Sequence, residues 1–112
     1  MPILFAIASC FVSAAYGHAI VLSATPGLHE TIHGPDVPIK IRFNSRIDPK
    51  RSRLTLFASD GKQTALGIAD ASSGESLISE ARGLKSGAYV IRWQVLAVDG
   101  HITRGQVQFR VQ

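Results

Sequence analysis

The sequence predicts a single all-β domain, a Greek-key β-sandwich or barrel of about seven strands. Apolar residues alternate with polar ones along several short segments, which is the period of a half-buried strand. Turn residues separate these segments at intervals of about 8–12 residues. Beyond an N-terminal apolar run, no segment shows sustained apolar spacing at three and four residues, so no amphipathic helix is expected.

The expected strands, each bounded by turn residues, are residues 18–24, 37–43, 54–57, 64–69, 76–81, 89–95 and 107–111. Thr25-Pro26-Gly27 closes the first strand. Asp60-Gly61 is a strong hairpin signal between the third and fourth strands, and Ser72-Ser73-Gly74 marks a loop. Tyr89 and Trp93 lie on the apolar side of their strand and are expected in the core.

The N-terminal segment has the features of a secretory signal peptide. The first 17 residues contain no charged side chain, and residues 3–12 form an apolar run too short to span a bilayer. Ala15-Tyr16-Gly17 supplies the small residues of a cleavage site, although no basic n-region precedes the run. We therefore expect a signal peptide at residues 1–17 and a mature domain at residues 18–112.

Cysteine and methionine are nearly absent, which restricts the metal chemistry of the mature domain. Cys10 is the single cysteine, and it lies in a lipobox-like Ile7-Ala8-Ser9-Cys10 that offers an alternative, lipidated start. A domain starting at residue 18 has no disulfide and no thiolate metal site. Met1 is the only methionine, so thioether ligands are absent too.

The net charge of +4 belongs entirely to the expected mature domain. Lys50, Arg51 and Arg53 form a small basic cluster, but Asp48 and Asp60 flank it and no aromatic residues are interleaved. A nucleic-acid interface needs a broader basic face, so we interpret the cluster as a solvated strand edge and expect no nucleic-acid partner. No second hydrophobic span follows the signal segment, so the mature chain is expected to be soluble and not membrane-spanning.

A histidine stands at each end of the mature domain. Cleavage at the expected site makes His18 the first residue, with a terminal amine and an imidazole. Asp99 and His101 are two residues apart, so extended backbone would direct both side chains to one side, and Gly100 lets the chain bend around an ion. Three nitrogens and one carboxylate suit Cu(II). Taken alone, Asp99 and His101 also fit a turn cap and a surface imidazole, and a lipidated start would remove the amine.

Two further histidines lie near the start of the domain. His29 and His33 are four residues apart, a metal-like spacing on a helix, but Pro26-Gly27 and Gly34-Pro35 favour a loop. We interpret them as solvent-exposed loop histidines, with a weak accessory metal site as the alternative.

Several motifs occur in a fixed order along the mature chain. His18-Ala19 and Thr25-Pro26-Gly27 stand near its start. Near its end follow Gly87-x-Tyr89-x-x-x-Trp93-x-Val95-x-x-Val98-Asp99-Gly100-His101 and Gly105-x-x-x-Phe109-x-Val111. With these motifs the sequence resembles the CopC family of periplasmic copper-binding proteins over essentially the whole mature chain, most closely over residues 84–111.

The resemblance implies a Greek-key β-barrel with immunoglobulin- or cupredoxin-like topology. It also implies a Cu(II) site formed by His18, through amine and imidazole, together with Asp99 and His101. Some family members hold Cu(I) in a methionine-rich loop, and this sequence lacks those methionines, so no such site is expected. A CopD-type inner-membrane copper transporter is the implied partner, as a separate protein because the chain stops at Gln112 without transmembrane helices.

The leading hypothesis is a periplasmic, non-enzymatic module that binds one Cu(II) per mature chain for copper resistance or homeostasis. A second is a small copper-brace enzyme of the lytic polysaccharide monooxygenase type, which also chelates copper with an N-terminal histidine. A mature chain of 95 residues leaves little room for its substrate face, and Asp99 would occupy a position that oxygen chemistry needs open. A third is an adhesion-type β-sandwich in which the histidines have no metal role.

Overall fold

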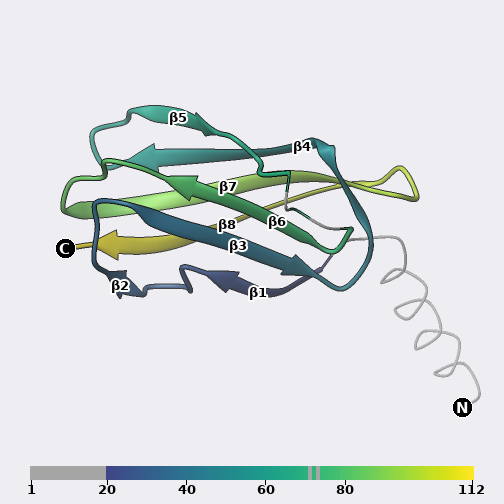
Figure 1. Cartoon of the computed structure of the whole chain (residues 1–112), viewed down its shortest axis with the longest axis horizontal. Helices are drawn as coiled ribbons and strands as arrows, with labels where there is room; N and C mark the ends of the chain where they lie inside the picture. Colours follow the sequence, from purple (N-terminus) through teal and green to yellow (C-terminus); the bar gives the residue numbers. More distant parts are fainter. Residues whose placement is uncertain (1–19, 71, 73) are drawn as a thin grey trace, which may run out of the picture.

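The described part of the chain forms eight β-strands (Figure 1). The computed structural model describes residues 20–70, 72 and 74–112, and these residues include no helix with the length and apolarity needed to cross a membrane. The strands are β1 (Val21–Thr25), β2 (Thr31–Ile32), β3 (Val37–Phe43), β4 (Ile47–Ala58), β5 (Gln63–Leu66), β6 (Ser76–Ala81), β7 (Gly87–Ala97) and β8 (Ile102–Val111).

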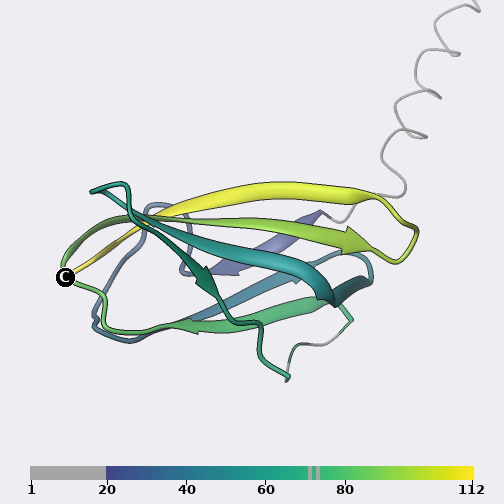
Figure 2. The ribbon, with the colours of Figure 1, turned by 90° about the horizontal axis from the view of Figure 1, so that it is seen from above.

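The strands form two sheets that face each other (Figure 2). The smaller sheet has the order β1-β3-β6 and the larger one β2-β8-β7-β4-β5. The β2–β8 pair is parallel, and the other pairs are antiparallel. The β3–β6 and β4–β7 pairs join strands that are distant in sequence, through connections that cross from sheet to sheet, as in a Greek key. The predicted all-β Greek-key sandwich is therefore confirmed, with eight strands instead of about seven.

The core lies between the two sheets, and the alternation of each strand selects its residues. Along β3, buried and exposed residues alternate without interruption. Tyr89 and Trp93 of β7 are buried in the core, as predicted. The Tyr89 ring stacks on Phe109 of β8 with the ring centroids 5.7 Å apart, and its hydroxyl donates to the Lys85 carbonyl at 2.7 Å. The polar end of the tyrosine is thus satisfied while its ring contributes apolar burial.

β4 begins earlier than the sequence predicted. The predicted strand started at Leu54, whereas β4 starts at Ile47. Its pairing with β7 is irregular between Asp48 and Arg53, and such a bulge breaks the alternation on which the prediction relied. The Ser52 hydroxyl donates to the Asp48 carbonyl at 2.7 Å and so satisfies a backbone group within the bulge.

The sequence did not predict β2, because this strand is too short to show a period. Thr31–Ile32 has two residues and lies beside the end of β8. Backbone hydrogen bonds hold it there: the Arg110 N–H donates to the Glu30 carbonyl at 2.8 Å, and the Gln112 N–H donates to the Ile32 carbonyl at 2.9 Å. In the first predicted strand, residues 18 and 19 lie outside the described part of the chain, and β1 covers residues 21–25.

Trp93 fits into the core because β8 has no side chain opposite it. Gly105 is the direct cross-strand partner of Trp93. A Cβ atom at position 105 would lie 2.5 Å from Cζ2 and 2.6 Å from Cε2 of the indole. The ring therefore lies against the backbone of β8, and the surrounding core leaves it little room to move.

We predict that Gly105→Ala destabilises the domain by about 1–3 kcal/mol, the usual cost of added volume in a packed core. Chemical denaturation measures this change in the free energy of unfolding. Gly67→Ala is the matched control, because a Cβ at Gly67 meets nothing within 4 Å. That variant should change the stability by no more than about 0.5 kcal/mol. Equal effects of the two substitutions would contradict the packing argument.

Candidate metal centre

The β7–β8 hairpin carries the Asp99-Gly100-His101 motif at its tip, which extends past the ends of the other strands (Figure 1). Two backbone hydrogen bonds close the turn. The Ala97 N–H donates to the His101 carbonyl at 2.8 Å, and the Gly100 N–H donates to the Ala97 carbonyl at 2.9 Å. Gly100 has a φ of +93°, which residues with a side chain rarely adopt, so this turn requires glycine.

Asp99 and His101 lie side by side in this turn. The Asp99 carboxylate accepts the backbone N–H of His101 through Oδ1 at 3.1 Å, and its Oδ2 lies 3.1 Å from the His101 imidazole Nδ1. The expectation that extended backbone aligns the two side chains is wrong, because both residues lie in the turn and not in a strand. The aspartate instead bonds to the backbone two residues ahead, a local geometry that this residue type favours.

The pair offers donors that suit a divalent ion. One carboxylate oxygen and one imidazole nitrogen lie 3.1 Å apart, and the two side chains are 39% and 59% exposed. Two donors in adjacent positions of a tetragonal site, each about 2 Å from the ion, lie about 2.9 Å apart. Little movement would therefore bring both onto one ion.

The third predicted ligand, His18, lies outside the residues that the structure describes. Within residues 20–70, 72 and 74–112, no group of three histidine, cysteine, aspartate or glutamate side chains is positioned to hold a metal. The structure thus brings together Asp99 and His101 and leaves the place of His18 as a prediction.

The loop between β3 and β4 holds both the start of the described chain and the base of the hairpin. The Ile20 N–H donates to the Asn44 side-chain oxygen at 2.8 Å, and the Asn44 N–H donates to the Ile20 carbonyl at 2.8 Å. Two residues farther on, the Arg46 carbonyl accepts the Val98 N–H at 3.1 Å. Ile20 and Val98 are therefore held at the same end of the sandwich. Sequence analysis missed this loop, because an asparagine signals a turn without showing what the turn contacts.

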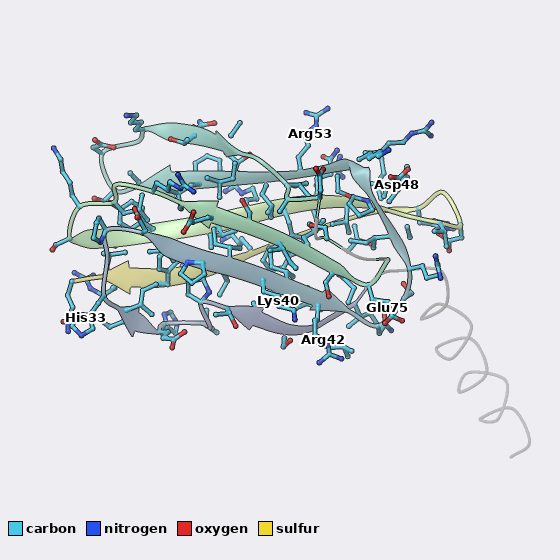
Figure 3. The ribbon with its side chains drawn as sticks, viewed as in Figure 1. His33, Lys40, Arg42, Asp48, Arg53 and Glu75 are labelled. Atoms are coloured by element: carbon cyan, nitrogen blue, oxygen red, sulfur yellow. The ribbon has the colours of Figure 1, made fainter. Side chains whose placement is uncertain are left out.

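His29 and His33 lie on either side of β2, as exposed residues outside any strand, which confirms the loop interpretation. The His29 N–H donates to the Gln108 carbonyl at 2.7 Å, near the C-terminal end of β8. About six residues of strand, or roughly 20 Å, separate Gln108 from the start of β8 at Ile102. Figure 3 shows His33 at the end of the sandwich opposite the hairpin. These histidines cannot join Asp99 in one site.

Comparison with known families matches the CopC domain to residues 21–112. The chain belongs to the CopC family. The CopC of Methylosinus trichosporium OB3b is similar in structure, with a TM-score of 0.76 and 28% sequence identity, over 85% of this chain and 94% of that protein. PcoC, a methionine-rich copper resistance protein from Escherichia coli, has a TM-score of 0.73 and 20% identity, over 86% of this chain and 100% of PcoC, which shows the shared fold. A comparison with curated proteins found no match.

We predict that Asp99→Ala and His101→Ala each change the free energy of unfolding of this CopC domain by less than about 1 kcal/mol. Their contact is exposed, and exposed polar contacts and single surface hydrogen bonds contribute little to stability. Thermal or chemical unfolding without metal measures the effect. A loss of several kcal/mol would mean that the pair holds the hairpin together, and effects of these variants on metal affinity would then reflect unfolding.

Proposed function

We propose that this CopC protein binds one Cu(II) ion through His18, Asp99 and His101 and serves in copper resistance or homeostasis. Membership of the CopC family supports the copper role in general. The observation that carries the specific site is the 3.1 Å approach of Asp99 Oδ2 to His101 Nδ1 at the exposed tip of the hairpin. Donors in such a place are open to an arriving ion and to a partner that removes it.

His18 is the proposed source of the remaining nitrogen donors. Two residues of chain span at most about 7 Å, which sets the reach of the proposed ligand from Ile20. Ile20 is bound to the β3–β4 loop, and the same loop binds Val98, the residue before Asp99. This arrangement supports a reach from His18 to the carboxylate. Cleavage after residue 17 would give His18 a free amine, and its amine and imidazole would chelate the ion together.

The donor set favours Cu(II) over Cu(I). Imidazole and amine nitrogens with a carboxylate oxygen suit the oxidised ion, whereas soft sulfur ligands select Cu(I). Met1 is the only methionine and Cys10 the only cysteine, and both precede the proposed mature start. Because the amine and the imidazoles bind copper only when unprotonated, the affinity should fall in acid.

We further propose that residues 1–17 are a cleaved signal peptide and that the mature protein acts in the periplasm. Lipidation of Cys10 is the alternative start, and the intact mass of the exported protein distinguishes the two. A CopD-type inner-membrane transporter is the proposed partner, and copper is the cargo. Because the Asp99 carboxylate adjoins His101, it would fill a coordination position that a copper-brace oxidase keeps open, so we assign no enzymatic activity.

The mature protein should bind one Cu(II) with a tetragonal, nitrogen-rich spectrum and no intense thiolate band. Loss of a residue that only supports a metal ligand typically weakens metal binding by roughly 10- to 100-fold. Because His101 is a proposed direct ligand, His101→Ala should weaken Cu(II) binding by more than this. Asp99→Ala should weaken it less than His101→Ala. Competition titration and electron paramagnetic resonance provide the two measurements. His29→Ala and His33→Ala are the matched controls at the other end of the sandwich. A large loss from either control would place the site elsewhere.

A single glycine added before His18 should weaken Cu(II) binding by orders of magnitude while the fold is unchanged. The addition preserves every side chain but turns the amine into an amide, which binds Cu(II) only after losing a proton. That proton is far harder to remove than the proton of an α-ammonium, whose pKa is about 7.7–8.0. Competition titrations of the processed and extended proteins at one pH provide the comparison. Equal affinities would show that the terminus is not a ligand.

A further inference from the structure

The outer surface of the five-stranded sheet carries an array of arginines. Along each strand, the side chains that alternate with core residues point away from the other sheet. Arginine occupies four such positions, and each of the four is exposed: Arg53 on β4, Arg92 on β7, and Arg104 and Arg110 on β8. We call these four residues the arginine face. The sheet that carries it runs along the upper side of Figure 2.

The strand register brings three of these arginines close together, and Arg110 lies farther along β8. Arg92 is paired with Thr55 on one side and with Gln106 on the other, and it is the diagonal neighbour of both Arg53 and Arg104. Diagonal neighbours in a sheet lie about 7–8 Å apart. This spacing is no larger than the screening length in physiological salt, so the fields of the three charges add.

Neutral amides hold the guanidinium groups of Arg92 and Arg104 and leave their charge in place. The Nε–H of Arg92 donates to the Gln106 side-chain oxygen at 3.2 Å, and the Nε–H of Arg104 donates to that of Gln94 at 3.0 Å. The Arg92 guanidinium also lies 4.5 Å from the centroid of the Phe57 ring. Arg92 and Arg104 are thus ordered for contact, and among the described residues neither has a bound carboxylate that would have to be displaced first.

No carboxylate lies on the strand segments that carry the arginine face. Residues 53–57, 88–94 and 104–110, which form its strands, contain neither aspartate nor glutamate. Among the described residues, none of the four arginines forms a salt bridge. The carboxylate nearest along β4 is Asp48, beyond the bulge, and it is 3.7 Å from Arg51. Uncompensated like charges raise the potential of a surface and attract an anionic partner.

The opposite face of the sandwich has the same kind of cations in a different setting. Lys40 and Arg42 lie on β3 of the three-stranded sheet (Figure 3). Glu80 of β6 is the diagonal neighbour of Lys40 and forms a 2.7 Å ion pair with Arg82. Mixed charge on this face and single-sign charge on the other indicate that one side of the domain is specialised.

We propose that the arginine face binds the phosphate groups of an anionic membrane surface. Guanidinium groups pair with phosphate through two parallel hydrogen bonds, and a membrane presents phosphate at many positions at once. Arginine is also enriched in protein interfaces, so an acidic protein is the competing partner. The exposed apolar residues at the hairpin end of the face decide for the membrane.

Apolar residues at the hairpin end of the face favour the same partner. Ile102 lies on the outer side of β8, two residues before Arg104, and is 48% exposed. Val98, in the adjoining turn, is 67% exposed. Basic residues beside exposed apolar ones are typical of surfaces that rest in the headgroup layer. This orientation would bring the turn that contains Asp99 and His101 to the membrane, although the proposal itself does not depend on copper.

Sedimentation of the exported protein with vesicles tests the proposal. We expect binding to vesicles of phosphatidylglycerol and phosphatidylcholine in equal parts, weakening as salt is raised, and much weaker binding to phosphatidylcholine alone. Arg92→Gln with Arg104→Gln should weaken binding about 25-fold, from about fivefold for each basic residue. The matched control, Lys40→Gln with Arg42→Gln, removes the same charge from the opposite face and should have an effect below about threefold.

Two further double variants separate folding from binding. Arg92→Lys with Arg104→Lys keeps the charge and should retain most of the binding. Arg53→Gln with Arg110→Gln should weaken binding as much as the first pair, without breaking either arginine–glutamine hydrogen bond. Equal losses from the two faces would show an effect of net charge alone and overturn the proposal. Equal binding to uncharged vesicles, or binding to polyaspartate but not to anionic vesicles, would also overturn it.

Discussion

The continuous pairing of β7 with β8 is the constraint on which the rest of the structure depends. Ten residues of β7 pair with ten of β8 in one antiparallel register. Because side chains alternate across a sheet, this register assigns Trp93 and Phe109 to the core and Arg92 and Arg104 to the outer surface. A slip of one residue would exchange the two sets. The same register carries the strands out to the turn, so the core, the arginine face and the candidate site share one origin.

The candidate site has little effect on the stability of the fold because it lies outside the core. Asp99 and His101 are exposed, and local hydrogen bonds and the left-handed Gly100 define their geometry. The rigid hairpin supplies only the platform. Such a division is common in proteins, because a loop on a stable scaffold can present reactive groups that a packed core could not accommodate. In the proposed function, the exposure of this pair of donors leaves a bound ion directly accessible from solvent.

The two outer surfaces of the sandwich differ in the partners of their cations. Glu80 of the three-stranded sheet is paired with Arg82, which follows β6, whereas on the five-stranded sheet Arg92 and Arg104 are paired with glutamine amides. An amide orders a guanidinium without neutralising it. The five-stranded face therefore presents guanidinium charge that no salt bridge among the described residues neutralises, and such charge attracts an anionic surface.

The sequence by itself determined the class of fold, the hairpin at Asp60-Gly61 and the core position of Trp93, because alternation and turn residues are local properties. Gly61 has the positive φ expected of it, and β4 pairs with β5 across that turn. The nitrogen and oxygen donors proposed for copper were also evident as residue types, and Asp99 does meet His101, although through a turn and not through a strand.

Only the tertiary structure decided which distant segments meet. β2 exists because the edge of β8 accepts it, and the β3–β4 loop joins the start of β1 to the base of the hairpin. Arg53 joins the arginines of β7 and β8 because β4 lies beside β7. Each of these contacts depends on pairing and packing between residues far apart in the chain, and a local pattern carries no information about its partner.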